Sequence, residues 1–197
     1  LSVPELKHRA ELDTKTGLWN DRYFIQALDQ ELSRSMRYER PLTVVLADLD
    51  YLREINNRYG HLAGDAVLTG IAEILDNYFR DYDIVARFGG EEFAILMPET
   101  SPEEALPRIE TISQAIERTA LSAPQVDQAL KITMSFGLAG IDTEQPSAER
   151  IIHCADLAMY TAKSAGRNQI RIYSPDLAPT PSLVEEVQSS PVNGKGY

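Results

Sequence analysis

Two strand-like segments separated by only four residues limit the folds open to this chain. Residues 84–88 and 93–97 are short and apolar, and Gly89-Gly90-Glu91-Glu92 joins them. We expect glycine to supply the unusual backbone dihedrals of a tight turn here. The pattern predicts an antiparallel hairpin with two acidic side chains at its tip.

The segments around this hairpin alternate between helical and strand-like patterns. Apolar residues recur every fourth position from Phe24 to Met36, which predicts an amphipathic helix that Pro41 ends. The other expected helices are a short one that ends at Tyr59, one that begins after breaks at Gly60 and Gly64 and ends at Tyr78, and two more over 101–121 and 147–165. The other expected strands are 42–47, 132–139 and 169–173. This order contains β-α-β-β-α-β, so we expect an α+β, ferredoxin-like fold of the nucleotide-cyclase or palm type. Its central, mainly antiparallel sheet should have about five strands, with helices mainly on one face.

The length of 197 residues suits one hydrophobic core rather than two domains. We expect residues 1–12 to be an upstream linker or helix end, 13–173 to be the folded domain, and 174–197 to be a flexible tail rich in Pro, Ser and Gly. The chain does not begin with Met. We therefore expect a fragment of a longer protein, from which an upstream sensory domain has been removed.

Charge and composition exclude several classes of function. Thirty acidic residues against 19 basic ones give a net charge of -11, which argues against nucleic acid or a membrane surface as a partner. The apolar runs are far shorter than the roughly 20 residues of a membrane helix. One cysteine, Cys154, allows no intrachain disulfide, and the first residues lack a secretion signal. The expected location is the cytoplasm, even if a membrane anchors the parent protein.

Acidic residues follow the expected central strand as well as the hairpin. Residues 42–47 run directly into Asp48-Leu49-Asp50, and in a ferredoxin-like sheet Asp48 can approach Glu91 and Glu92. Gathered carboxylates repel one another unless a hard cation lies among them. Magnesium also binds substrate phosphates, so the pattern favours phosphoryl or nucleotidyl transfer. The alternative is that these acids are merely solvated, as isolated exposed acids usually are.

The hairpin residues Gly89-Gly90-Glu91-Glu92-Phe93 resemble the signature motif of the GGDEF family, the bacterial diguanylate cyclases. The likeness extends from about Asp13 to Tyr173. It includes, in the family's order and spacing, Asp48-Leu49-Asp50, Asn56, Tyr59-Gly60-His61, Gly64-Asp65 and Lys163-Ser164-Ala165-Gly166-Arg167-Asn168. The resemblance implies condensation of two GTP into cyclic di-GMP with loss of two pyrophosphates.

The resemblance also implies roles for the acids and for the phosphate-binding residues. Asp48, the carbonyl of Leu49 and Glu91 would hold Mg²⁺, with Mn²⁺ as a second candidate, and Glu91 would accept the proton of the attacking hydroxyl. Glu92 would ligate a second ion or support the hairpin, and Asp50 would be structural. Three basic residues would contact phosphates: Lys163, Arg167 and Arg53, the last of which stands where the family usually has lysine and would stabilise the transition state.

A second group of residues matches the family's substrate and product sites. Asn56 and Asp65 would read guanine, because a carboxylate accepts from N1–H and the exocyclic amine together. His61, Gly89 and Gly90 would also contact the substrate. Arg80 and Asp83 form an RxxD pattern at which cyclic di-GMP would bind as an inhibitor. Cys154 and His153 receive no function.

Some positions depart from the family pattern, and alternatives to catalysis remain open. Lys15, Trp19 and Asp21 replace leucine, proline and arginine of the entry motif, which puts the coupling to an upstream sensor in doubt. Leu52 and Asn57 replace Phe and Asp at positions without an assigned chemical role. We expect a homodimer in which two half-sites face each other. The alternatives are a module that senses GTP or cyclic di-GMP without turnover, and a palm-type enzyme with other substrates.

Overall fold

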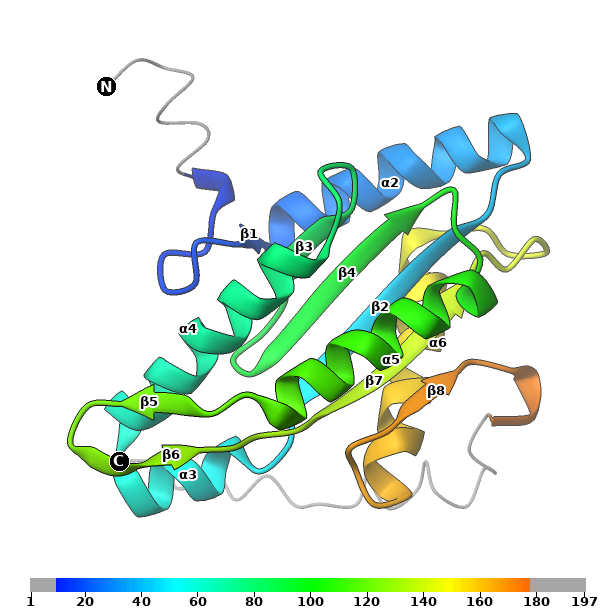
Figure 1. Cartoon of the computed structure of the whole chain (residues 1–197). Helices are drawn as coiled ribbons and strands as arrows, with labels where there is room; N and C mark the ends of the chain where they lie inside the picture. Colours follow the sequence, from blue (N-terminus) through cyan, green and yellow to red (C-terminus); the bar gives the residue numbers. More distant parts are fainter. Residues whose placement is uncertain (1–9, 178–197) are drawn as a thin grey trace, which may run out of the picture.

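A six-stranded sheet forms the centre of the structure, a computed structural model that describes residues 10–177 (Figure 1). The strand order is β1-β3-β4-β2-β7-β8. The strands are β1 (Trp19–Asn20), β2 (Leu42–Leu49), β3 (Ile84–Arg87), β4 (Glu92–Pro98), β7 (Met134–Gly140) and β8 (Ile170–Ile172). The four central strands are antiparallel to one another, whereas the edge strands β1 and β8 pair parallel with β3 and β7. The mainly antiparallel α+β sheet is therefore confirmed, with β1 as a strand beyond the expected five.

Helices cover both faces of this sheet (Figure 1). On one face α3 (Leu52–Tyr59), α4 (His61–Tyr78) and α5 (Pro102–Arg118) share one apolar core with the sheet. On the other face α2 (Asp21–Tyr38) and α6 (Ala148–Ser164) share a second core. The expectation of helices mainly on one face is wrong, because the apolar stripes of α2 and α6 cover the side of the sheet that α3 to α5 leave open.

The central strand β2 is buried along its whole length. It lies between β4 and β7, with a helical layer on each face, so none of its eight residues reaches solvent freely. A continuous apolar run is the pattern that such a strand requires. Its last residues, including Asp48, are consequently carried into a buried position.

Several element boundaries differ from those expected. The helix expected over 101–121 ends at Arg118, and β5 (Leu121–Ala123) and β6 (Val126–Leu130) follow as a separate two-stranded sheet beside α4. Gly64 lies inside α4 instead of breaking it. The start of α5 is as expected, with a capping box between Ser101 and Glu104.

The terminal regions are described only in part. Ala10 and Glu11 are helical, and Leu12 bridges to Trp19. At the other end, Pro175–Leu177 forms a short 3-10 helix, η1. Most of the expected upstream linker and C-terminal tail lies outside the described residues. Within residues 10–177, no helix is long and apolar enough to cross a membrane.

Candidate active site

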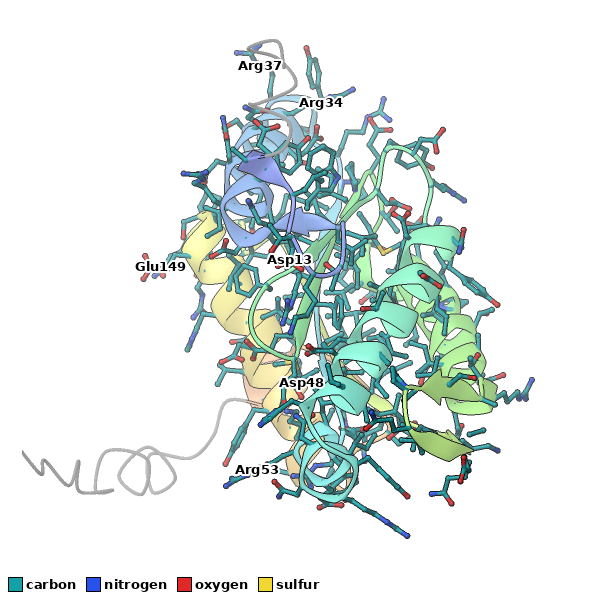
Figure 2. All side chains as sticks on the ribbon, turned by 90° about the vertical axis from the view of Figure 1, so that its left-hand side faces the viewer. Asp13, Arg34, Arg37, Asp48, Arg53 and Glu149 are labelled. Atoms are coloured by element: carbon teal, nitrogen blue, oxygen red, sulfur yellow. The ribbon has the colours of Figure 1, made fainter. Side chains whose placement is uncertain are left out.

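The three acids singled out in the sequence meet at one end of β2 and β4. Asp48 is the register partner of Glu92 across the two strands, and the amide of Leu49 donates a 3.2 Å hydrogen bond to the carbonyl of Glu91. Asp48 is buried, with 4% of its surface exposed, while Glu91 and Glu92 are half-buried. Figure 2 shows Asp48 low in the molecule, between the lower turns of the helices, with Arg53 below it on α3.

Burial and mutual repulsion raise the pKa of each acid in this cluster. For Asp48, burial raises the pKa, and the attraction of Lys163 opposes this effect without cancelling it. For Glu91, burial and then the negative charge of Asp48 raise the pKa. For Glu92, burial and then the negative charges of Asp48 and Asp156 raise the pKa. Burial is the largest cause for all three acids, so their charged forms are disfavoured in the metal-free protein.

Two basic residues from the end of α6 lie beside the acids. Lys163 Nζ is 2.5 Å from Asp48 Oδ1, an ion pair between α6 and β2. Arg167 stacks over the ring of Tyr51, with its guanidinium carbon 4.7 Å from the ring centroid. Both Arg167 and Tyr51 have positive φ, in turns that bring them together just beyond α6 and β2. The positive charges of Lys163 and Arg167 both act on Asp48 and lower its pKa, in opposition to burial.

Asp50 is hydrogen-bonded through its side chain to other residues of the fold. Its carboxylate accepts hydrogen bonds from the hydroxyls of Thr133 and Ser135, both at 2.7 Å, and from the amide of Asn168 at 2.9 Å. These bonds tie the end of β2 to β7 and to the turn after α6. A carboxylate with this many partners fits the structural role expected of Asp50.

An open cavity of about 520 Å³ lies over the acidic cluster. Its walls are formed by the acids together with residues from α3, α4, β3 and the N-terminal turn, which is the segment 13–18 closed by a hydrogen bond from the amide of Asp13 to the carbonyl of Leu18. The lining residues are Lys15, Asp48, Leu52, Asn56, Asp65, Leu68, Arg87, Gly90, Glu91 and Glu92. The acidic cluster and the two expected guanine readers therefore share one cavity.

Gly64 makes room for Asn56 in this cavity. A Cβ at Gly64 would lie 1.9 Å from Asn56 Oδ1, which no real contact allows. Asn56 Oδ1 is buried and has no hydrogen-bond partner. A buried amide oxygen left without a partner is costly, and it is typical of a site that a ligand completes.

The hairpin tip is held by close contacts rather than by unusual glycine dihedrals. Neither Gly89 nor Gly90 has a φ in the left-handed range, so that expectation is wrong. A Cβ at Gly89 would instead meet Glu92 Oε2 at 2.6 Å, which explains the glycine by the close approach of a carboxylate. Gly90 faces open space in the cavity. The side chain of Arg87 donates to the carbonyls of Gly89 at 3.1 Å and Gly90 at 2.7 Å.

The N-terminal turn is fastened to this hairpin through Arg87. Arg87 also donates to Asp13, 3.2 Å away, and Asp13 in turn accepts from the amide and hydroxyl of Thr16. Burial by itself would raise the pKa of Asp13, but the bonds from Thr16 and Arg87 outweigh it and lower that pKa. The turn, β3 and the hairpin tip thus form one hydrogen-bonded unit.

Five residues expected to contact the substrate lie outside the cavity wall. Arg53 and His61 are exposed at the N-terminal ends of α3 and α4, Arg167 lies against Tyr51, Lys163 is paired with Asp48, and Gly89 lies in the hairpin tip. None of the five is among the residues that line the cavity. Their expected contacts with a substrate stay predictions.

The acids form no ready-made metal site on their own. Among residues 10–177, no group of three or more His, Cys, Asp or Glu side chains is arranged to hold an ion. The residues nevertheless fit a divalent cation that arrives with a substrate. Asp48 is buried, and burial raises its pKa even though its Oδ1 is paired with the Lys163 ammonium at 2.5 Å. Oxygen ligands supplied partly by phosphates are what magnesium prefers.

The RxxD residues line a separate cavity of about 380 Å³ near the start of β3. Asp83 is buried there and accepts from Arg108 at 2.7 Å and from the amide of Arg80 at 3.0 Å, while its second oxygen has no partner. Arg80 contacts the hydroxyl of Tyr82 and lies over its ring. One oxygen of Asp83 is thus committed to the fold, and the other is buried without a hydrogen-bond partner.

Sequence reasoning missed three residues at these two sites. Lys15 was noted only as a departure from the family motif, yet it lies in the cavity wall. Arg87 gave a detectable signal, because a charged residue ends an otherwise apolar strand just before the glycines. Arg108 gave none, since it lies 25 positions from Asp83 on another element.

The comparisons with known proteins agree with this geometry. The family model described as "Diguanylate cyclase, GGDEF domain" matches residues 10–169. The six-stranded α+β sheet flanked by helices is the fold of GGDEF domains, as its superposition on solved GGDEF domains shows. The chain belongs to the GGDEF family, and it is a GGDEF domain of the diguanylate cyclase type.

Individual relatives are similar along most of the chain. Diguanylate cyclase DosC of Escherichia coli is 33% identical over 171 residues, which cover 87% of this chain and 37% of the relative. The GGDEF domain of TpbB (YfiN) from Pseudomonas aeruginosa superposes with a TM-score of 0.80 at 30% identity, covering 88% of this chain and 99% of that one. The GGDEF domain of DgcB from Caulobacter crescentus, in complex with c-di-GMP, has a TM-score of 0.79 at 26% identity, over 83% and 93% of the two chains. The chain spans little more than a third of the length of the first curated relatives that it matches.

Proposed function

We propose that this chain condenses two GTP into cyclic di-GMP and releases two pyrophosphates. The observation that carries the proposal is the single cavity in which Asp48, Glu91 and Glu92 lie with Asn56 and Asp65. Acids suited to a metal–phosphate complex and polar groups suited to a guanine are both required for this reaction. The family match and the similarity to diguanylate cyclases support the same function.

The guanine end of the cavity selects the substrate. Asp65 accepts hydrogen bonds from the N1–H and the exocyclic amine of guanine, and Asn56, with an unpartnered oxygen, supplies a further polar contact. Adenine offers no such pair of adjacent donors. GTP is therefore the proposed substrate, with its phosphates directed toward the acidic cluster and contacted by Lys163, Arg167, Arg53 and His61, while Gly89 and Gly90 let the nucleotide approach the backbone.

Asp48, the carbonyl of Leu49 and Glu91 are the proposed ligands of Mg²⁺ or Mn²⁺. Glu92 either supports the hairpin, as its contact over Gly89 indicates, or binds a second ion. A bound divalent ion would lower the pKa of the ribose hydroxyl and neutralise charge on the α-phosphate. Lys163 would then exchange Asp48 for a phosphate oxygen, which keeps its ammonium paired throughout.

Glu91 is the proposed proton acceptor. The 3′-hydroxyl of one nucleotide loses its proton to the Glu91 carboxylate as its oxygen attacks the α-phosphorus of the other nucleotide. The new bond joins O3′ to phosphorus, and the bond from that phosphorus to the departing pyrophosphate breaks. Glu91 lies in the wall of the cavity beside Asp48, where a carboxylate can reach the hydroxyl of a bound nucleotide.

Two copies of the chain are proposed to act together. The product is twofold symmetric, and the attacking group and the attacked group come from different GTP molecules, so a symmetric pair of half-sites is the simplest arrangement. Turnover per subunit should therefore fall when the protein is diluted. Constant specific activity far below the dimer dissociation constant would contradict this arrangement.

The deciding experiment is incubation with Mg·GTP and identification of the product by mass. Cyclic di-GMP should form with the wild-type chain and should be lost in Glu91→Gln, while Glu110→Gln, a neutralised exposed glutamate on α5, should be active. Binding of GTP without product in the wild type would instead favour the alternative function, a sensing module without turnover. Preference for ATP over GTP would exclude both.

A further inference from the structure

Lys15 lies in ionic contact with the residue proposed to read guanine. Its Nζ is 2.5 Å from Asp65 Oδ1, and the two residues are 50 positions apart in the sequence. Both side chains are about 40% exposed, and both line the cavity that also holds Asn56. The ion pair is therefore formed within the substrate cavity itself.

We propose that Lys15 is a specificity-determining residue that binds the O6 atom of guanine. This inference rests on the proposed function, because it assumes that Asp65 receives a guanine. It assigns a role to a side chain that stands where the family's entry motif carries leucine, a residue with no hydrogen-bonding group.

The N-terminal turn holds Lys15 in place before any nucleotide arrives. Asp13 accepts from the amide and hydroxyl of Thr16, and the amide of Gly17 donates to the carbonyl of Asp13 at 2.9 Å. The amide of Asp13 donates to Leu18, which closes the turn on both sides. Arg87 fixes the turn to the hairpin. A lysine on such a turn loses less conformational entropy on binding than one on a free loop.

The order of polar atoms on guanine matches the order of these two side chains. Along one edge of the base, the O6 acceptor stands next to the N1–H donor, and the exocyclic amine follows. When Asp65 accepts from N1–H and the amine, a cation beside the carboxylate oxygen that accepts from N1–H faces O6. Lys15 is such a cation, and it can donate to Asp65 and to O6 at once, because an ammonium has three donors.

Adenine is disfavoured by the same arrangement. Its exocyclic amine stands where guanine has O6, so Lys15 would face a donor instead of an acceptor. Asp65 would face the unprotonated N1 of adenine, so both side chains would lose their partners. A polar site discriminates against an analogue that leaves the donors and acceptors of the site without partners on the ligand.

The test compares nucleoside diphosphates, which bind without the pyrophosphate leaving group that the reaction needs. GDP, 6-thio-GDP and IDP are titrated into the wild-type chain, Lys15→Met and Lys15→Arg by calorimetry. Sulfur at position 6 is a poor acceptor, so 6-thio-GDP probes Lys15, whereas IDP lacks the exocyclic amine and probes Asp65. Lys131→Met is the matched control, because Lys131 is an exposed lysine outside this cavity.

We expect the wild type to prefer GDP over 6-thio-GDP by about tenfold, as for a hydrogen bond to a charged group. Lys15→Met should reduce this preference to about twofold or less, Lys15→Arg should keep part of it, and all variants should keep the preference for GDP over IDP.

An unchanged preference for GDP over 6-thio-GDP in Lys15→Met would overturn the assignment. Tighter GDP binding by Lys15→Met would also overturn it, because Lys15 would then compete with guanine for Asp65. If the wild type binds no guanine nucleotide, the proposed function fails together with this inference; binding without discrimination by Lys15 refutes the inference alone.

Discussion

Lys163 forms an ion pair with Asp48 at 2.5 Å, so a basic residue from α6 closes the end of the central strand. The pair is only partly exposed, with 27% of the lysine side chain and 6% of the aspartate side chain accessible. Removing one member of such a pair leaves the other charge uncompensated. The same pairing puts Lys163 in competition with any cation that Asp48 binds.

Lys163→Met should destabilise the metal-free domain and increase its response to magnesium. We expect the free energy of unfolding to fall by about 1–3 kcal/mol, because Asp48 loses its partner in a largely buried position. Added Mg²⁺ should then raise the melting temperature more in this variant than in the wild type. Thermal denaturation with and without Mg²⁺ measures both effects, with Lys131→Met as the control. Equal magnesium responses in the two proteins would contradict the competition.

Glu92→Gln should stabilise the metal-free domain at neutral pH. The folded-state pKa of Glu92 is raised, so the folded domain binds its proton more tightly than the unfolded chain does. Wild-type stability therefore falls as the pH rises through the unfolded and then the folded pKa, and the penalty is absent well below the unfolded value. Glutamine removes the charge, so the gain should be at most about 1 kcal/mol after allowance for solvent screening.

Denaturant unfolding of Glu92→Gln at pH 4 and pH 7.5 measures this linkage. The variant and the wild type should differ more at the higher pH. Glu110→Gln on the exposed face of α5 serves as the control. A larger difference at pH 4 would show that the sign of the shift is wrong.

Asp13 should show the opposite pH dependence. Its folded-state pKa is lowered, so its contribution to stability is present above the unfolded pKa and is lost as the pH falls through the folded pKa. Asp13→Asn should lower the free energy of unfolding by about 1–2 kcal/mol at pH 7, because the charged bonds from Arg87 and Thr16 are weakened. The difference should shrink below about pH 4, near the ordinary pKa of aspartate. Urea unfolding at several pH values tests this, and a difference independent of pH would refute it.

Gly64→Ala should weaken nucleotide binding through Asn56. The added methyl group would overlap Asn56 Oδ1 and force that side chain out of the cavity wall. We expect GDP to bind about tenfold more weakly, as after the loss of a polar contact of about 1.4 kcal/mol. In an Asn56→Ala background the same substitution should have little effect on binding. Additive effects of the two substitutions would mean that Gly64 acts by another route.

Arg80→Ala should relieve inhibition by cyclic di-GMP without lowering the initial rate. Arg80 contacts Tyr82 and lies in the cavity that holds the unpartnered oxygen of Asp83, away from the acidic cluster. If product binds here, the inhibitory concentration should rise at least tenfold, since hydrogen bonds from arginine to phosphate are charge-assisted. Initial rates at increasing added product measure it. Unchanged inhibition would place the inhibitory contact elsewhere.

The sequence predicts the sheet and its acidic end well, because both depend on local pattern. The apolar run of 42–47 has the composition of a strand covered on both faces, and Asp48 follows it without a break. The glycines and acids after residue 88 mark a hairpin tip. Once the strand order is known, the convergence of Asp48 with Glu91 and Glu92 follows from register alone.

Features that depend on contacts between residues far apart in the sequence could not be predicted from local sequence pattern. The pair of residues in β1 is too short to give a strand pattern and is defined by its pairing with β3. Residues 121–130 form a hairpin beside α4, whereas the sequence pattern assigned only Leu121 to a helix and predicted no strands here. Gly64 marks a helix break by local rules, whereas its place in α4 reflects the room that Asn56 needs. The contact of Lys15 with Asp65 spans 50 positions and has no local signature.

The position of β1 makes the start of the domain mechanically sensitive. Asn20 pairs with Arg87, so the entering chain is in register with the residue that holds the carbonyls of Gly89 and Gly90. Slippage by a single residue along β3 would displace the preceding turn by about 3.3 Å, the rise of one strand residue. Lys15 would then lose Asp65 altogether. Movement of the entering polypeptide would therefore be transmitted, through only a few residues, to the part of the cavity wall that Lys15 and Asp65 form.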